Sequence, residues 1–183
     1  MDQYLSAAVK LHQYLVANHW RNQALLGPDP GVRLNYRIGR FIKSYTRCLP
    51  WSDDYYYFQA QGYWVLSNWL LFIRTGEEEY AEIATRCSDY IISQQRDDGA
   101  WDYPNPEWKG RVTTYEGTWA AFGLLETYRQ KAQQNFLDGA LRWHKFQVDT
   151  MGFQESGNEL AVNYFANREF PRVPNASTDI LRF

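Results

Sequence analysis

The sequence has little net charge, no long hydrophobic run and no leader-like N-terminus, and each of these shortages excludes a class of function. The formal net charge is -2 over 183 residues, so no overall field attracts nucleic acid or an anionic lipid surface. The apolar run 63–73 is too short and too interrupted to cross a bilayer. The N-terminus lacks the charged-then-apolar layout of a signal peptide. We therefore expect a cytoplasmic protein without nucleic-acid or membrane partners.

Cysteine and histidine are equally scarce. The chain holds 2 Cys and 3 His, and no pair among them has the spacing of metal ligands. Cys87 lies on the apolar face of an expected helix, which favours a buried free thiol over a reactive one. His12 and His144 also lie on apolar helix faces, and we interpret them as hydrogen-bonded core residues. We expect no metal and no cofactor.

What the sequence does contain is helical periodicity, with almost no strand pattern. Apolar residues recur at spacings of three and four along most of the chain, and glycine, proline or capping residues separate the segments. A further helix is expected to begin at Asn175 or Ser177. The predicted fold class is all-α, with one domain over 1–183. The expected helices are 2–19, 33–48, 54–75, 77–95, 115–129 and 134–147.

Two kinds of helix alternate along this chain. Segments 54–75 and 115–129 are apolar nearly all round, whereas 77–95 and 134–147 are apolar on one face only. A helix that is apolar on most sides touches protein on most sides, and an amphipathic helix shows one face to water. The alternation therefore predicts inner and outer helices of concentric layers. A weak repeat supports this, because Gln61-Gly62 and Glu116-Gly117 each begin an inner helix.

A turn motif follows the first of the two amphipathic segments, 77–95. Tyr90-Ile91 followed by Gln95, Gly99 and Trp101 resembles the Q-x3-G-x-W repeat of the terpenoid cyclase and protein prenyltransferase toroids. In that repeat Gln caps helix ends, Gly makes the turn and Trp stacks on the helix pair. A second copy with the same spacing ends in Phe153. The resemblance implies antiparallel helical hairpins of an α/α toroid, of which this chain supplies about half a ring.

The catalytic landmarks of those enzymes are missing. The stretch 52–55 lacks the leading Asp of a D-x-D-D proton donor, and neither cysteine has the neighbours of a prenyltransferase zinc site. Aromatic and acidic residues at helix starts resemble the six-hairpin carbohydrate-active toroids instead. That resemblance implies a glycosidase, uronyl epimerase or lyase that binds a saccharide. The alternative is a non-catalytic helical-repeat scaffold or a degenerate or fragmentary toroid, and a terpenoid cyclase-like protein comes third.

Carboxylates at the expected starts of inner helices are the catalytic candidates. Glu116 begins the helix at 115, and Asp53 and Asp54 begin the one before it. Such residues can act as general acid, base or nucleophile in glycoside chemistry. The alternative interpretation is structural, because a first-turn Glu complements the helix dipole and an Asp caps a helix. We expect the amides of the first turn to favour the ionised form of Glu116 unless desolvation prevails.

Aromatic residues gather near the loop ends that would form one rim of the toroid, where sugar faces can stack on indole and phenol rings. Trp101 has a competing interpretation as a clamp on the helical hairpin. The segment 33–47 is rich in Lys and Arg and forms either a solvated outer face or a contact for an anionic partner. A half ring leaves apolar surface open, so we expect a homo-oligomer or a missing C-terminal half. The expected substrate-binding residues are Trp101, Tyr103, Trp108, Tyr115 and Tyr55.

Overall fold

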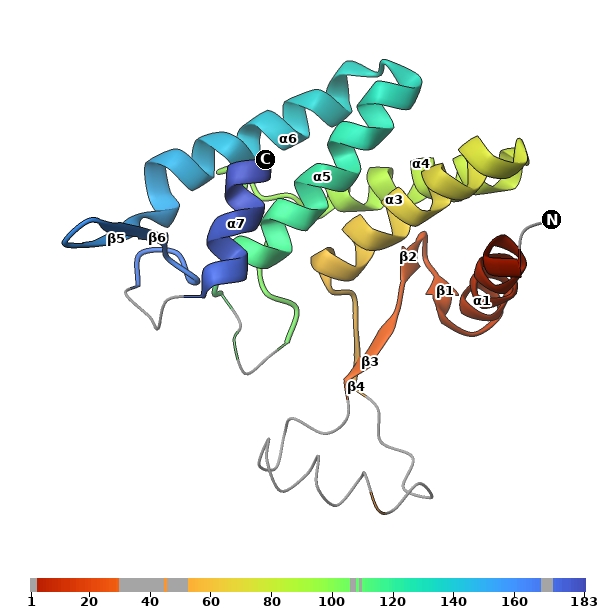
Figure 1. Ribbon diagram of the computed structural model, residues 1–183, viewed down its shortest axis with the longest axis horizontal. Helices are drawn as coiled ribbons and strands as arrows, with labels where there is room; N and C mark the ends of the chain where they lie inside the picture. The colour runs from red at the N-terminus through yellow and green to blue at the C-terminus, as the bar shows by residue number, and fades with distance from the viewer. Residues whose placement is uncertain (1–2, 30–44, 46–52, 106–107, 109, 169–172) are drawn as a thin grey trace.

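The computed structural model describes residues 3–29, 45, 53–105, 108, 110–168 and 173–183. This described part of the chain is built mainly of helices, which confirms the main feature of the all-α prediction (Figure 1). The expected helix 33–48 lies outside the described residues. Among the helices that are described, none is both long and apolar enough to span a membrane. The helices are α1 (Gln3–His19), α3 (Phe58–Thr75), α4 (Glu78–Ser93), α5 (Thr114–Lys131), α6 (Gln134–Phe146) with a π-helical extension (Gln147–Met151), and α7 (Pro174–Arg182).

Local sequence signals explain most of these boundaries. The Thr113 hydroxyl caps α5 by accepting a hydrogen bond from the Glu116 amide. At the end of α3, Gly76 adopts a left-handed φ of 74° and its amide donates to the Phe72 carbonyl at 2.8 Å. The start of α3 differs from the prediction, because the helix begins at Phe58 and not at residue 54. The residues before it are held extended in a strand pair, so Asp53 does not cap this helix.

Short antiparallel strand pairs connect and flank the helices, although the sequence pattern predicted almost no strands. The clearest is the β5–β6 hairpin, whose two-residue loop carries Gly157 at a φ of +61°. The pair β3–β4 forms a ribbon that extends away from the helices in Figure 1. The strands are β1 (Trp20–Arg21), β2 (Ala24–Leu25), β3 (Gly27–Asp29), β4 (Asp53–Tyr55), β5 (Phe153–Ser156) and β6 (Glu159–Val162).

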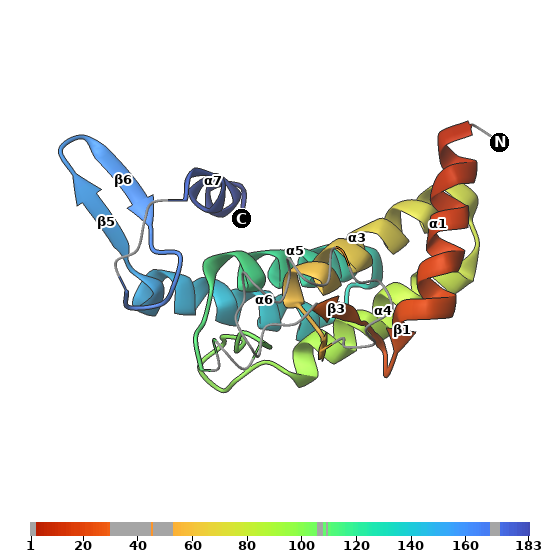
Figure 2. The ribbon, with the colours of Figure 1, turned by 90° about the horizontal axis from the view of Figure 1, so that it is seen from below.

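The helices lie in layers. Figure 2 shows α3 and α5 side by side, with α4 and α6 on one side of them and α7 on the other. The α3 and α5 backbones approach closely at Gly62, where an added Cβ would lie 2.0 Å from the Trp119 carbonyl oxygen. Only a residue without a side chain allows this contact. The close pair forms the centre of the core, with Val65, Ala120, Ala121 and Leu124 buried around it.

A buried histidine fixes α1 to this core. The His12 ring is 4% exposed, stacks on Trp64 at 4.8 Å and lies 2.8 Å through Nε2 from Asn68 Oδ1. The expectation of a hydrogen-bonded core residue is therefore confirmed for His12. It is wrong for His144, which is exposed on α6 with its ring 6.1 Å from that of Phe183. Cys87 is a buried free thiol, as predicted, and burial raises its pKa.

The close contact of α3 and α5 predicts an unusual response to Gly62→Ala. In an exposed helix this change stabilises by about 1 kcal/mol. Here the new methyl group overlaps the Trp119 backbone, so we expect a loss of about 3 kcal/mol in the free energy of unfolding. Denaturant titration followed by circular dichroism measures it. Ser67→Ala, on the exposed side of the same helix, is the control and should change stability little. Equal stability of Gly62→Ala and the wild type would contradict the packing described.

Candidate functional site

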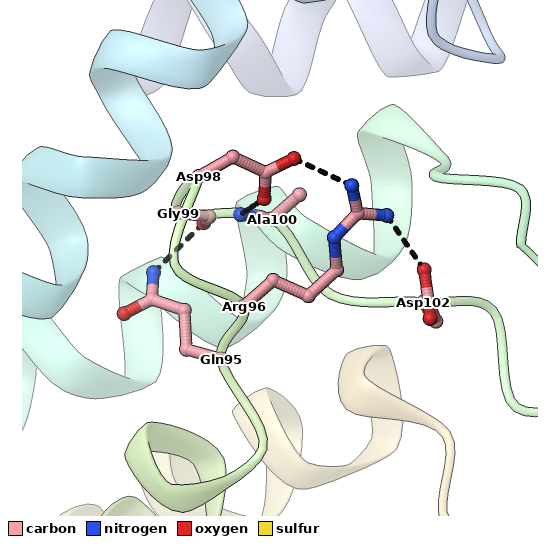
Figure 3. A network of polar contacts seen from close by, with 6 residues as sticks. All are labelled: Gln95, Arg96, Asp98, Gly99, Ala100 and Asp102. Atoms are coloured by element: carbon pink, nitrogen blue, oxygen red, sulfur yellow. Dashed lines mark hydrogen bonds and ion pairs between the residues drawn. The ribbon is translucent and has the colours of Figure 1, made fainter.

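The turn that leaves α4 ties the end of this helix to α6. Gln95 donates from Nε2 to the carbonyl oxygen of Gly99 at 2.8 Å (Figure 3). It also donates to the carbonyl oxygen of Gly139 at 2.9 Å, so its side chain joins the end of α4 to α6. Gly99 has a φ of +91°, and an added Cβ would lie 2.4 Å from the Arg142 carbonyl oxygen. Both the backbone conformation and the lack of space require glycine at this position.

Trp101, which follows this turn, belongs to the core. Its ring is 1% exposed, packs against Phe58 and Trp143, and donates from Nε1 to the Ile91 carbonyl at 2.8 Å. It offers no surface to a ligand, so its expected place among the substrate-binding residues is corrected to that of a clamp. The second copy of the spacing does not form the same turn, since Phe153 lies 60% exposed on β5.

The charged residues of the turn make a fixed ion-pair network. The Arg96 guanidinium lies between two carboxylates, with Nη2 2.5 Å from Asp98 Oδ2 and Nη1 2.7 Å from Asp102 Oδ1 (Figure 3). Asp98 also accepts from the Ala100 amide at 3.1 Å. Because these groups are about half exposed, the pairs contribute little to stability. Their effect is to hold the Arg96 side chain in one orientation.

An aromatic cleft opens beside Arg96, between the start of α3 and the end of α4. Its volume is about 330 Å³, which is within the usual range of small-ligand pockets. Four tyrosine rings and several polar side chains line it. The polar groups supply both hydrogen-bond donors and acceptors. The lining residues that carry these functions are Tyr55, Tyr56, Tyr90, Tyr103, Gln94, Arg96 and Asp102.

Three of the five aromatic residues expected at a binding rim belong to one row of ring contacts, and two of them, Tyr55 and Tyr103, line the cleft. A row of ring contacts joins Tyr55 to Tyr57 at 6.1 Å, Tyr57 to Tyr103 at 5.7 Å and Tyr103 to Trp108 at 4.8 Å. The row connects the residues before α3 with the segment before α5. Tyr115 lies elsewhere, with its hydroxyl 3.3 Å from that of Tyr63 on the face of α3 and α5 near α7.

Sequence reasoning missed the contribution of α4 to the cleft. Tyr90 and Gln94 lie four residues apart at its C-terminal end and therefore share a face. This spacing, next to the recognised turn, is the signal that would have found them. Asp102 and Arg96 look like ordinary turn residues in the sequence, and only the ion pairs reveal that they border the cleft.

Glu116 takes a structural position at the first turn of α5. Its side chain is buried, at 5% exposure, and Oε2 accepts a hydrogen bond from the Gln59 amide at 2.9 Å. The Phe58 amide also hydrogen-bonds to it. These are free amides of the first turn of α3, which has no capping side chain of its own at Tyr57. Glu116 thus caps a neighbouring helix and joins the N-termini of α3 and α5.

Burial dominates the acidity of this carboxyl group. Desolvation raises the pKa of Glu116 to about 7, while the amide hydrogen bonds from Gln59 and Phe58 act in the opposite direction. Desolvation therefore outweighs the stabilisation that the first-turn amides were expected to give to the ionised form of Glu116. Gly117 does not open the site to a ligand, because an added Cβ would meet the Trp143 indole at 2.3 Å. The indole fills the space beside Gly117.

The carboxylates expected to work as a pair lie in different secondary-structure elements, with Glu116 in α5 and Asp53 and Asp54 in β4. Asp53 and Asp54 lie in β4, opposite Asp29 and Pro28 of β3, and not at the start of a helix. Glu116 lines neither the aromatic cleft nor the second hollow on the other side of Arg96. Among the residues that the structure describes, no group of three or more His, Cys, Asp and Glu side chains is arranged to hold a metal ion.

Comparison of the chain with protein-family models, with curated proteins and with solved structures gives no match.

The position of Glu116 predicts how stability depends on pH. The folded protein keeps this proton up to about pH 7, whereas the unfolded chain releases it near its ordinary pKa of about 4.3. The unfolded state therefore binds fewer protons between these values, and the contribution of Glu116 to stability falls as pH rises from about 4.5 to 7. The fall amounts to about 3 kcal/mol.

Glu116→Gln keeps the shape of the side chain and an oxygen that accepts from the Gln59 amide, but it removes the charge. We expect this variant to be as stable as the wild type or more stable at pH 8, and relatively less stable at pH 4.5. Denaturant titrations at several pH values measure the difference. Glu82→Gln, an exposed residue of α4, is the control. Parallel pH curves for wild type and Glu116→Gln would show that the carboxyl group is not buried as described.

Proposed function

We propose that this protein binds a saccharide in the aromatic cleft. The observation that supports the proposal is the composition of the cleft, in which Tyr55, Tyr56, Tyr90 and Tyr103 stand around a hollow bordered by an ordered ion pair. Sugar rings carry C–H groups on their faces and hydroxyl groups around their edges. Flat aromatic rings suit the faces, and paired donors and acceptors suit the hydroxyl groups.

The polar groups of the cleft are held in place before any ligand arrives. Arg96 is fixed by Asp98 and Asp102, and the Asp102 carboxylate has a second oxygen that can accept from a hydroxyl group. Gln94, at the end of α4, adds an amide that both donates and accepts. Pre-organised groups lose little conformational freedom on binding, which favours affinity.

The cleft favours binding over glycoside hydrolysis. Hydrolysis ordinarily needs two carboxyl groups on opposite sides of the scissile bond. Asp102 lines the cleft and is already paired with Arg96, while Glu116 is directed at the amides of α3 and lies outside the lining. The proposed role is therefore recognition of a saccharide. Catalysis by Glu116 with Asp53 or Asp54 receives no support from their positions.

We further propose that the helices form part of an α/α toroid, with α3 and α5 as inner helices and α4 and α6 as outer ones. The layers in Figure 2 support this arrangement, as does the exposed face of α3, where Leu70 is 61% and Ile73 56% exposed. An inner helix of an incomplete ring would leave such a face open. Sedimentation showing a monomer whose apolar face binds no hydrophobic dye would contradict the proposal.

A non-catalytic helical scaffold is the second candidate, and one observation favours it. An apolar groove of about 590 Å³ runs between α1 and α3, on a different side of α3 from the aromatic cleft. A scaffold protein would use this groove for a protein partner and would leave the cleft empty. A screen against neutral and acidic glycans separates the two candidates, because absence of binding to every glycan favours the scaffold.

The cleft predicts the effect of removing one aromatic ring. Tyr103→Ala should weaken binding of the strongest glycan from such a screen about tenfold, since loss of a stacked ring removes roughly 1 kcal/mol or more. Tyr103→Phe retains the ring and should bind nearly as well as the wild type. Isothermal titration calorimetry gives the affinities, and thermal unfolding shows whether each variant is folded.

Tyr14→Ala is the matched control, because Tyr14 is an exposed tyrosine of α1 outside the cleft. It should bind like the wild type. Two results would contradict the proposed function: no glycan binds to the wild-type protein, or folded Tyr103→Ala binds as tightly as the wild type.

A further inference from the structure

A second hollow lies on the other side of Arg96 and is rich in arginine. Its volume is about 270 Å³, and it is formed by the turn after α4, the segment before α5 and the residues on either side of the β5–β6 hairpin. Three arginines and one aspartate contribute to its wall, together with two uncharged polar side chains. These residues are Arg96, Arg111, Arg168, Asp98, Thr150 and Asn167.

Arg111 is the best placed of these cations to meet a ligand. Its guanidinium lies over the rings of Trp108, at 5.9 Å, and Phe165, at 5.3 Å from the ring centroids. Contacts with aromatic rings engage the faces of the guanidinium and leave its in-plane N–H groups able to donate. Within the described part of the chain, no carboxylate is paired with Arg111. This arrangement suits a planar or tetrahedral anion.

The one acid of this hollow is already engaged by other groups, and it shares the Arg96 cation with Asp102. Asp98 receives the Arg96 guanidinium at 2.5 Å and the Ala100 amide at 3.1 Å. Asp98 is thus directed at Arg96 and Ala100, and among the residues that the structure describes no ion pair joins it to Arg111. Arg168 adds a further guanidinium, so the arginines of the wall outnumber its acid. Thr150 and Asn167 supply neutral hydrogen-bonding groups beside the cations.

The basic hollow and the aromatic cleft adjoin each other. Arg96 lines both, with one guanidinium nitrogen bound to Asp102 on the cleft side and the other to Asp98 on the basic side. The aromatic row also continues across, because Trp108 contacts Tyr103 at 4.8 Å and Phe165 at 5.2 Å. A ligand that stacks on Tyr103 can thus extend toward Arg111.

We infer that the saccharide recognised by this protein is acidic, with its sugar ring in the aromatic cleft and a carboxylate or sulfate group of the same or the next residue at Arg111. This inference rests on the proposed saccharide-binding function and assigns the ligand class of that site. A uronate and a sulfated sugar present the same chemistry to a guanidinium, namely an anion with several acceptor oxygens.

The test compares an acidic saccharide with its neutral ester and with ligands that carry a sulfate group. An oligouronate, its methyl-esterified neutral counterpart, a sulfated oligosaccharide and inorganic sulfate are titrated by calorimetry into the full chain at low salt. The acidic oligosaccharide should bind at least about tenfold more tightly than the ester, as expected for one charge-assisted pair. Preference for the sulfated ligand over the uronate, or the reverse, identifies which acidic group is the natural one.

Arg111→Gln should abolish the advantage of the acidic ligand and leave the affinity for the neutral ester within about twofold. Arg111→Lys keeps the charge but lacks the planar, bidentate guanidinium, and it should retain part of the advantage. With two variants, a folding defect in one of them still leaves the role of Arg111 testable. Arg86→Gln, an exposed arginine of α4, is the control for net charge and should behave as the wild type.

Equal affinity for the acidic ligand and its ester would overturn the inference and leave the proposed saccharide-binding function standing. An acidic preference that survives in folded Arg111→Gln would overturn the assignment of Arg111. Binding of inorganic sulfate with no binding of any oligosaccharide would overturn both the inference and the proposed function.

Discussion

The close contact between α3 and α5 positions everything else in this molecule. Gly62 allows the two backbones to meet, and the Glu116 carboxyl group accepts hydrogen bonds from the first amides of α3. The two helices therefore begin at the same end of the core. The residues that lead into them must then approach each other at that end, and the contact of Tyr57 with Tyr103 at 5.7 Å shows that they do. The aromatic cleft is a consequence of this shared starting point.

Much of this architecture could be predicted from the sequence, because it depends on local signals. Helical periodicity located α1, α3, α4, α5 and α6 to within a few residues, and the glycine of the α4 exit predicted the turn. Of the five aromatic residues expected at one rim, Tyr55, Tyr103 and Trp108 lie in one row of ring contacts. These residues flank helix starts, and neighbouring inner helices were expected to begin at one rim.

The remainder depends on partners that are distant in the sequence. Nothing near Glu116 indicates that its carboxyl group caps another helix, and nothing near Gly117 indicates that the Trp143 ring fills the adjacent space. Trp101 and Tyr103 are both aromatic residues of the same loop, and the sequence alone does not distinguish them. Packing against other helices places the Trp101 ring in the core and leaves the Tyr103 ring in the cleft. Asp53 and Asp54 have the pattern of helix caps, but pairing with β3 overrides it. The β5–β6 hairpin had a usable signal, the Gly157-Asn158 pair between two short apolar-containing runs.

The central claim is that a saccharide binds in the aromatic cleft at the start of α3 and the end of α4. NMR of ring-labelled tyrosine tests this claim most directly. Some tyrosines line the cleft and others lie on α1, so the resonances that shift on addition of a saccharide locate its binding site. The account predicts shifts for Tyr56, Tyr90 and Tyr103, with Tyr4 and Tyr14 of α1 unchanged. Shifts confined to the tyrosines of α1, or no shift with any neutral or acidic saccharide, would contradict it.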